Sequence, residues 1–241
     1  MHGVVEFRGD QTMKRRIAVI AAHPDDEVLG CGATIARHAA GGDEVHVLIV
    51  AEGATSRRAA RDRSAAKDEL SQLAASARAA NQVLGTAHLE LLDFPDNRLD
   101  SIDLLEVVKA VESFLDKCKA QTIYTHWPFD LNVDHRVVSE AVQTACRPTP
   151  QSTQEQLLFF EVPSSTEWRV SAGRAFEPTY FVDVSATFES KQRALSAYAN
   201  EMRAWPHARS LEAVESLARW RGASVGVKAA EAFVLGRALI R

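Results

Sequence analysis

The chain has few cysteines, and they form no pattern. Its 241 residues contain only Cys31, Cys118 and Cys146, an odd number at wide spacing. This spacing fits neither a disulfide framework nor a CxxC metal knuckle. We therefore predict three reduced thiols, of which Cys31 is close enough in sequence to the motif described below to line its pocket.

Long apolar runs and blocks of like charge are also absent. No apolar run exceeds the length of a strand, and residues 1–11 lack the apolar core of a signal peptide. The net charge of -4 at pH 7 comes from interspersed charges, which leaves no basic patch for nucleic acid. These absences predict a cytoplasmic protein with no membrane span and no nucleic-acid partner.

A glycine-rich dinucleotide motif is the third missing feature. Gly30 and Gly32 come late after the first predicted strand, and no third glycine stands in register with them. A Gly-x-Gly-x-x-Gly run directly after the first strand is the fingerprint of nucleotide-binding dehydrogenases. The sequence therefore argues against a dehydrogenase.

What the chain does have is a regular alternation of strand-like and helix-like segments. Short runs rich in Ile, Val and Leu predict strands, and segments with apolar residues at helical spacing follow them. The predicted strands are 17–22, 45–50, 88–94 and 122–126, and the predicted helices are 28–38, 57–84, 103–117 and 133–146. This alternation predicts an α/β fold with a Rossmann-like, mostly parallel sheet flanked by helices.

The pattern becomes less regular beyond Pro148. Strands are predicted at 157–162 and 179–184, and helices at 186–201, 211–219 and 228–239. Because neither a linker nor an internal repeat separates this part, we predict a single domain. It consists of a loose arm (1–13), a Rossmann-like part (14–147) and a C-terminal α+β extension (148–241) that completes the pocket.

A dense cluster of ionisable residues, His23–Glu27, follows the first predicted strand. Ligands of open α/β sheets bind at the carboxyl ends of the strands, and Pro24 favours a turn at that point. His135 reaches the same edge after the fourth strand, so it can join His23 and Asp26. Two imidazoles and one carboxylate are a standard ligand set of catalytic zinc. Asp25 remains free to accept a proton as a general base.

Plainer interpretations exist for both groups of residues, the one after the first predicted strand and the one after the fourth. The carboxylates of His23–Glu27 could cap helix amides, and Glu27 is best interpreted as a helix-start residue favoured by the dipole. Asp134 could likewise be a cap, and His135 a structural histidine. Two such clusters, each after a strand end, are harder to interpret as caps. A magnesium site would rely on oxygen ligands, and two histidines favour zinc instead.

The run Ala22–Glu27, together with Asp134–Arg136 after the fourth strand, resembles the PIG-L or LmbE-like family of metal-dependent N-deacetylases. The resemblance covers residues 15–146. It implies an enzyme with Zn²⁺, or another divalent metal such as Fe²⁺, that removes an N-acetyl group from an amino sugar and releases acetate and a free amine. By position, it implies His23, Asp26 and His135 as metal ligands and Asp25 as the general base.

The sequence departs from the family at Asn132, where many relatives have a histidine that protonates the leaving amine or steadies the oxyanion. A neutral amide can hydrogen-bond an oxyanion but cannot donate a proton as an acid. Asp25 could return the proton itself. Otherwise His207 is the first candidate for the missing proton donor and His126 the second. His207 could instead be an exposed loop residue, and His126 a packed residue at a strand end.

Loops after the other strands supply candidate substrate contacts. Carboxylates and guanidinium groups are natural partners of sugar hydroxyls and phosphates. The candidates are Arg57, Asp96, Arg98, His126 and Arg209, with Glu52 at the same edge. The resemblance implies that Asp96 binds sugar hydroxyls, although a turn role is equally open, and the arginines at 57–63 are more simply interpreted as a solvated helix end.

Two function classes remain open beside each other. The first is an N-deacetylase of a free, nucleotide-linked or glycoconjugate amino sugar, in polysaccharide or secondary-metabolite biosynthesis as the resemblance implies. The second is a zinc-binding family member that has lost catalysis and acts as a binding or regulatory protein, an alternative that Asn132 keeps open. Relatives often associate, so a homo-oligomer is one option for the oligomeric state, which the sequence leaves open.

Overall fold

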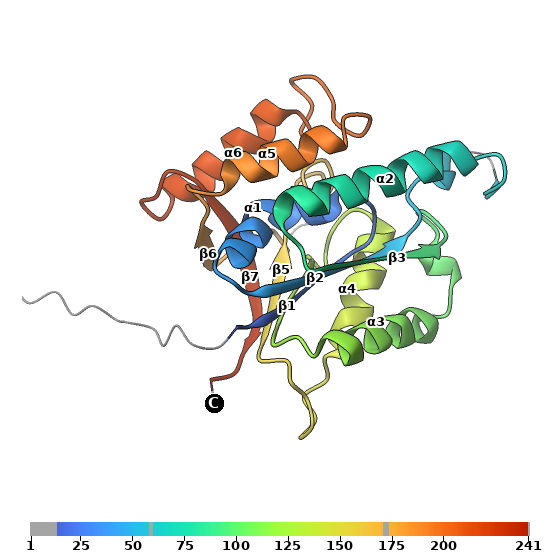
Figure 1. Ribbon diagram of the computed structural model, residues 1–241, viewed down its shortest axis with the longest axis horizontal. Helices are drawn as coiled ribbons and strands as arrows, with labels where there is room; N and C mark the ends of the chain where they lie inside the picture. The colour runs from blue at the N-terminus through green and yellow to red at the C-terminus, as the bar shows by residue number, and fades with distance from the viewer. Residues whose placement is uncertain (1–13, 58–59, 171–173, 241) are drawn as a thin grey trace, which may run out of the picture.

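The computed structural model describes residues 14–57, 60–170 and 174–240, and gives only the backbone of Arg57. The predicted loose arm, 1–13, lies outside the described residues. One sheet of seven strands runs through the described chain in the order β3-β2-β1-β4-β5-β7-β6 (Figure 1). Its strands are β1 (Arg16–Ala21), β2 (Glu44–Ala51), β3 (His88–Phe94), β4 (Thr122–His126), β5 (Gln156–Phe160), β6 (Tyr180–Asp183) and β7 (Ala230–Ala238).

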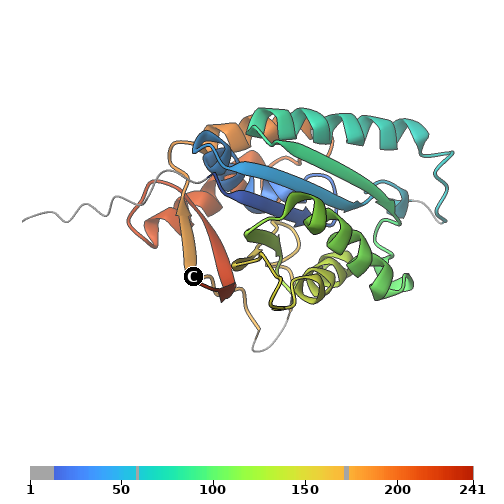
Figure 2. The ribbon, with the colours of Figure 1, turned by 60° about the horizontal axis from the view of Figure 1, so that its bottom comes forward.

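Five strands, β1 to β5, are parallel, and β7 pairs antiparallel with both β5 and β6. The predicted α/β class with a mostly parallel sheet is thus confirmed. Helices cover both faces of this sheet (Figure 2). They are α1 (Asp26–Ala40), α2 (Lys67–Leu84), α3 (Leu104–Cys118), α4 (Val133–Ala145), α5 (Phe188–Ala197) and α6 (Leu211–Ala223).

Strand β1 lies inside the sheet, between β2 and β4, and is buried on both faces. Ile17 and Val19 pack with α1, α2 and α5 on one face, and Ala18 and Ile20 pack with α3 and α4 on the other. Burying one such Ile or Val side chain contributes about 1.5–3 kcal/mol. This two-sided burial accounts for the continuous apolar run of β1, and it fixes the turn after β1 at the carboxyl edge of the sheet.

The helix predicted at 228–239 is wrong, because this segment forms strand β7. Its Lys, Ala, Glu and Leu residues have high helix propensity, but pairing with β5 and β6 overrides it. Gly236 lies against Phe159, so that a Cβ at 236 would come within 2.6 Å of the ring. A glycine at this position therefore lets β7 approach β5 closely.

The helix predicted at 57–84 starts later, at Lys67. Arg61 and Arg63 lie in the loop before it and bind the Glu52 carboxylate, with Arg61 Nε 2.9 Å and Arg63 Nε 3.0 Å from it. Arg63 also pairs with Asp93. These two arginines are therefore held in ion pairs and not in the solvated helix end that the sequence suggested.

Helix α1 is interrupted at Cys31, whose φ of -149° and ψ of 25° are not helical. The buried Glu231 of β7 accepts the backbone N–H groups of Ala33 (3.1 Å) and Thr34 (2.7 Å) that this break exposes. Lys191 of α5 lies 2.6 Å from Glu231 and donates to the carbonyl of Leu29 (2.8 Å). One buried ion pair from the C-terminal part thus satisfies both ends of the break.

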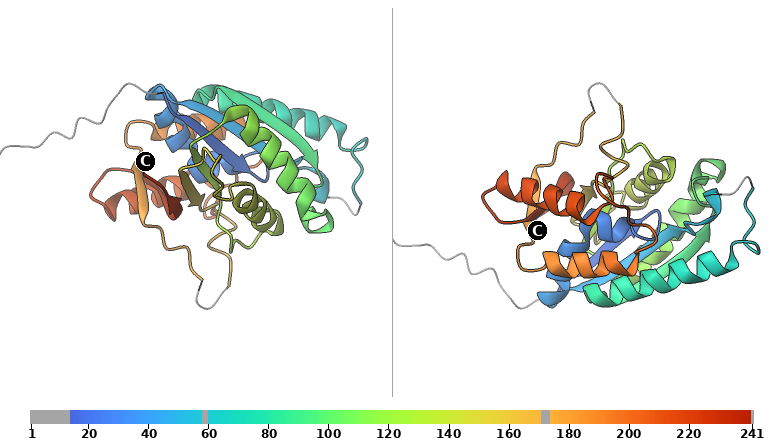
Figure 3. Two further views of the ribbon diagram at one scale, coloured as in Figure 1. Left: turned by 90° about the horizontal axis from the view of Figure 1, so that it is seen from below. Right: turned by 90° about the horizontal axis from the view of Figure 1, so that it is seen from above.

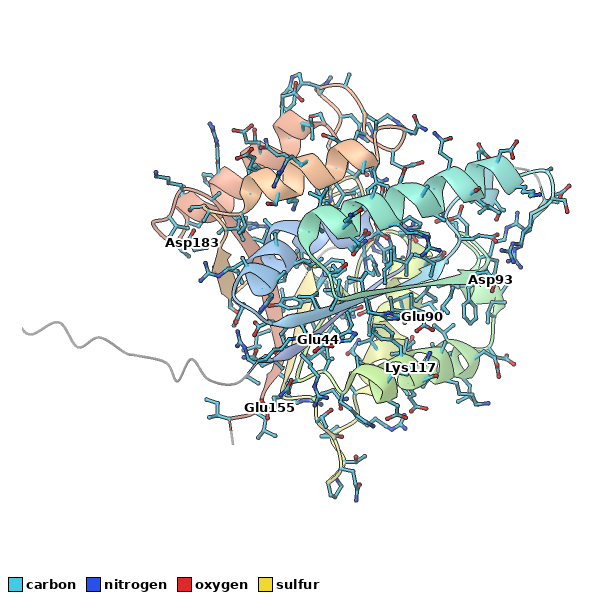
Figure 4. The ribbon with its side chains drawn as sticks, viewed as in Figure 1. Glu44, Glu90, Asp93, Lys117, Glu155 and Asp183 are labelled. Carbon is cyan, nitrogen blue, oxygen red and sulfur yellow. The ribbon has the colours of Figure 1, made fainter. Side chains whose placement is uncertain are left out.

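The edge strand β3 carries charged side chains, which discourage pairing with another sheet edge. Lys117 of α3 reaches Glu90 of β3 at 3.2 Å (Figure 4).

At the other side of the molecule, α5 runs alongside α2 and α1 (Figure 3). No helix in the described part of the chain has the length and apolarity needed to cross a membrane.

Candidate metal centre and active site

Most of the candidate residues gather at the carboxyl edge of the sheet. His23, Asp25 and Asp26 lie in the turn after β1 and at the start of α1, and His135 lies in the first turn of α4. Asp96 follows β3. The sheet-edge prediction therefore placed these five side chains in the right region.

Asp26 lies between the two histidines. Its Oδ2 atom is 3.2 Å from Nδ1 of His23 and 3.1 Å from Nε2 of His135. One ligand atom from each of the three residues lies within 4.8 Å of the others, and all three are buried. Oδ1 of Asp26 is buried and has no hydrogen-bond partner among the described residues. A metal ion fits this donor set, because it would satisfy the lone carboxylate oxygen and both imidazoles.

The protonation of the cluster reflects the strong coupling of these groups. Burial acts to lower the pKa of His135, but the carboxylates of Asp26 and Asp130 outweigh it and raise the pKa to about 9. Burial acts to raise the pKa of Asp26, but His135 and His23 hold it well below its usual value. Metal binding to such a site displaces protons from the imidazoles.

Each of the two imidazoles also faces a carboxylate on its other nitrogen. Nε2 of His23 lies 3.0 Å from Asp134, and Nδ1 of His135 lies 3.1 Å from Asp130. Carboxylates in this position fix the tautomer and the ring orientation of metal-binding histidines. Asp134 is not the cap of α4, a role that Asn132 has. Its carboxylate accepts the N–H groups of Asn97 (2.7 Å) and Leu99 (2.9 Å), and so ties the loop after β3 to His23.

A second group, His23 with Asp96 and Asp134, also has metal-ligating atoms close together. Its carboxylates already accept backbone hydrogen bonds: Asp96 accepts the N–H of Ser56, and Asp134 accepts the N–H of Asn97. We therefore interpret this group as the support of His23. Asp96 lies 3.4 Å from Nε2 of His23, so it borders the candidate centre as predicted.

Asp25 lies beside the cluster in a strained conformation. Its φ of 106° is in the left-handed region, which costs of the order of 1–3 kcal/mol for a residue other than glycine. Glu27 Oε2 accepts its backbone N–H (3.0 Å), and Nη1 of Arg209 donates to its Oδ2 (2.7 Å). Burial raises the pKa of Asp25 to about 8 against the opposing charge of Arg209.

Glu27 does more than start a helix. It is fully buried, and its Oε1 accepts hydrogen bonds from the Tyr198 hydroxyl (2.8 Å) and from Nδ2 of Asn81 (3.0 Å). Burial raises its pKa to about 7. Glu27 therefore joins α1, α2 and the end of α5, and it holds the backbone of Asp25.

Asn132 caps helix α4. Its Oδ1 accepts the N–H of Asp134 (2.8 Å), and its Nδ2 donates to Oδ1 of Asn97 (2.9 Å). Both ends of the amide are thus used within the protein. This geometry matches a helix cap, and no part of it requires a catalytic amide.

His126 lies against the candidate metal centre, with Nε2 3.7 Å from Oδ2 of Asp26, whereas the described side-chain contacts of His207 are with Arg209 and Trp168. His126 is fully buried, accepts the N–H of Ala22 on Nε2 (2.8 Å) and stacks on His135 with ring centroids 3.9 Å apart. Burial lowers its pKa well below the usual value. His207 accepts the N–H of Arg209 on Nδ1 (3.0 Å), and its ring lies 5.6 Å from that of Trp168.

The predicted arginines differ in their surroundings. Arg209 points to Asp25, not to an open anion site. The Arg98 guanidinium has no hydrogen bond or ion pair within residues 14–57, 60–170 and 174–240, so it remains a candidate substrate contact. The Arg57 side chain lies outside the described residues.

Sequence reasoning missed several residues of the site. Asp130 lies in the loop after β4, and Ser164, Ser165 and Thr166 lie in the loop after β5. Their place at strand ends was a signal that could have found them. Tyr198 carried no comparable signal, because its partner Glu27 is 171 residues away in sequence.

Comparison with known proteins agrees with this geometry. Residues 18–146 match the family described as PIG-L: GlcNAc-PI de-N-acetylase. Because the match spans more than half of the chain, the chain belongs to this family, as its sequence resemblance predicted. It is 29% identical over 169 residues to the uncharacterized deacetylase YaiS of Escherichia coli, covering 68% of this chain and 82% of that protein.

Solved structures share the fold over nearly the whole chain. N,N'-diacetylchitobiose deacetylase from Pyrococcus horikoshii superposes with a TM-score of 0.72 at 18% identity, covering 92% of this chain and 84% of that chain. GalB of Pseudomonas putida, a 4-carboxy-2-hydroxymuconate hydratase, also gives 0.72 at 20% identity, covering 94% and 98%. The same fold thus carries two reactions, so the reaction must be argued from the site.

Proposed function

We propose that the protein is a zinc-dependent hydrolase that removes an N-acetyl group from an amino sugar and releases acetate and a free amine. Membership of the de-N-acetylase family supports N-deacetylation. One observation carries the proposal: His23, Asp26 and His135 converge on one point while the carboxylate of Asp25 stays outside that set. These are the parts of a metal-assisted amide hydrolase.

The metal is proposed from the donor chemistry. Two imidazoles and one carboxylate suit zinc, and Fe²⁺ accepts the same donors. When bound, zinc supplies Lewis acidity, which polarises the amide carbonyl and makes water a better nucleophile near neutral pH. His23, Asp26 and His135 would hold it, with Asp134 and Asp130 orienting the two imidazoles.

We assign the proton transfers to Asp25. Arg209 occupies its Oδ2, whereas Oδ1 has no hydrogen bond with the described residues, so Oδ1 is the atom that takes the proton of the attacking water. The new C–O bond forms, the C–N bond breaks, and Asp25 returns the proton to the leaving amine. This assignment needs no acid from Asn132, His126 or His207. Nδ2 of Asn132, Nε2 of His126 and Nδ1 of His207 are hydrogen-bonded within the protein.

The proposed substrate class is an N-acetylated amino sugar, free, nucleotide-linked or part of a glycoconjugate. YaiS is named a deacetylase, and the Pyrococcus protein is named for a diacetylated disaccharide. Asp96 borders the centre and Arg98 is unpaired within the described chain, so we propose these two as contacts for substrate hydroxyls or phosphates.

An acetate-release assay tests the proposal. The zinc-loaded protein is incubated with a panel of N-acetylated mono- and disaccharides and nucleotide sugars, with chelated protein as the control. We expect acetate and free amine in equal amounts from at least one substrate, and none after chelation. Tight zinc binding without acetate from any substrate would instead favour the non-catalytic alternative.

A further inference from the structure

Three consecutive hydroxyl residues, Ser164, Ser165 and Thr166, form a tight turn after β5, which we call the hydroxyl turn. The backbone N–H groups of Ser165 (3.2 Å) and Thr166 (3.0 Å) both donate to the carbonyl of Val162. The turn therefore starts four residues beyond Phe160, the end of a buried parallel strand. It lies at the same sheet edge as the candidate metal centre.

Two of these hydroxyls bind Asp130, which is itself fully buried. The Thr166 hydroxyl accepts the N–H of Val162 (2.8 Å), so its proton is directed to Oδ2 of Asp130 (2.5 Å). The Ser165 hydroxyl donates to Oδ1 of Asp130. The same Oδ1 atom faces Nδ1 of His135 at 3.1 Å. The hydroxyls thus hold the carboxylate that lies beside a proposed metal ligand.

The third hydroxyl, that of Ser164, lies on the side of the proposed base, Asp25. Nε of Arg209 donates to Oγ of Ser164 (2.7 Å), and Nη1 of the same guanidinium donates to Asp25 (2.7 Å). Ser164 adopts a left-handed φ of 70°, and Glu167 accepts its backbone N–H (2.6 Å). A strained residue held by a neighbouring side chain indicates a position that the surrounding structure determines.

We propose that the hydroxyl turn positions both halves of the site at once. Ser165 and Thr166 act through Asp130 on His135, and Ser164 acts through Arg209 on Asp25. The three residues are adjacent, so one rigid turn sets where the proposed base lies relative to the metal ligand. The base half of this inference rests on the proposed reaction, whereas the metal half rests only on the proposed metal site.

Zinc affinity tests the metal half without any substrate. Ser165→Ala and Thr166→Val are compared with the wild type by competition against a chromogenic chelator. Each should weaken zinc binding about tenfold, as the loss of groups that orient metal ligands does elsewhere. Ser185→Ala is the matched control, because its hydroxyl also donates to a carboxylate, Asp183 (2.5 Å), but on the edge strand β6.

Thermal unfolding in the presence of a chelator separates positioning from folding. If Ser165→Ala and Thr166→Val lower only the melting temperature and leave the zinc dissociation constant at the wild-type value, the hydroxyls are structural and the metal half is wrong. A dissociation constant that rises in the control Ser185→Ala as well would also overturn it.

The variant Ser164→Ala tests the base half. We expect an unchanged zinc dissociation constant, a kcat reduced about tenfold and an unchanged KM, because only an interaction needed in the transition state is removed. Ser164→Gly should behave in the same way, since glycine tolerates the left-handed φ and so removes the hydroxyl without adding strain. A rise in KM with unchanged kcat would mean that Arg209 serves the substrate, and would overturn the inference.

The Arg209 Nε–H proton provides a readout that needs no turnover. In the wild type it should exchange slowly with solvent in NMR spectra, and in Ser164→Ala it should exchange quickly; Arg209→Lys assigns the signal. Equal exchange in both proteins would contradict the role of Ser164. A wild type that releases no acetate from any substrate would refute the proposed function, while the zinc and exchange measurements would still decide the role of the hydroxyl turn.

Discussion

The N-terminal and C-terminal parts of the molecule contribute different things to the site. The part up to α4 carries the side chains proposed to bind metal, accept protons and contact substrate. The part after α4 carries groups that hold those side chains: the hydroxyl turn, Lys191, Tyr198, Arg209 and Glu231. The family match ends at residue 146, close to this division.

Reactive groups and the groups that support them are thus separated in the chain and joined only by the fold. Strand β7 inserts between β5 and β6 and brings Glu231 to the break in α1. The end of α5 brings Tyr198 to Glu27. Substitutions in the first part should therefore affect chemistry first, and substitutions in the second part should affect stability and geometry first.

Asp25→Asn should have the largest effect and should act on chemistry alone. The amide keeps the shape of the side chain but cannot accept the proton of water, so kcat should fall about 100- to 10,000-fold. Zinc content, measured by elemental analysis, should remain at the wild-type ratio, because Asp25 lies outside the ligand set. Hydrolysis within tenfold of the wild type would show that another group is the base.

Lys191→Met should have the largest effect on stability in the C-terminal part. Lys191 and Glu231 are both about 95% buried as side chains, and removing one partner leaves an uncompensated charge in the interior. We expect the free energy of unfolding to fall by about 3–5 kcal/mol, measured by urea denaturation.

The double variant Lys191→Met with Glu231→Gln provides the control for this prediction. Gln can still accept one of the N–H groups of Ala33 and Thr34 that Glu231 now binds, and it leaves no unpaired charge. The double variant should therefore be more stable than Lys191→Met alone. A double variant that is less stable than the single one would mean that the charge itself is not the cause.

Tyr198→Phe should have a smaller effect that reaches both stability and activity. It removes one donor from Oε1 of Glu27, while Asn81 remains. The loss should be about 1–2 kcal/mol in the free energy of unfolding, with a reduced kcat because Glu27 holds the strained backbone of Asp25. Tyr180→Phe is the matched control, since the Tyr180 hydroxyl has no hydrogen bond within the described chain. Equal melting temperatures for both variants would argue against a role for the Tyr198 hydroxyl.

The first part of the fold could be predicted from the sequence because its signals are local. The apolar run of β1 and the turn at Pro24 lie within eight consecutive residues, 17–24, and a polar cluster directly after a buried parallel strand is typical of a ligand site. Strand β7 could not be predicted in this way. Its composition favours a helix, and its strand geometry comes from pairing with Leu158 and Phe159, residues far away in sequence. The same holds for Glu231, which binds Ala33 over a separation of 198 residues.

Asn132 could belong either to the groups that support the site or to the groups that act in the reaction, and substitutions there should have the smallest effect. If Asn132 acts as a helix cap, Asn132→Ser should keep both stability and kcat, because a serine hydroxyl can accept the N–H of Asp134 that the amide now accepts. Asn132→Ala should cost about 1 kcal/mol in the free energy of unfolding, with kcat changed little. If instead the amide steadies the oxyanion, both variants should lose kcat to the same degree while Ser retains the stability of the wild type. Urea denaturation and initial rates on the two variants thus decide whether this residue belongs with the supports or with the chemistry.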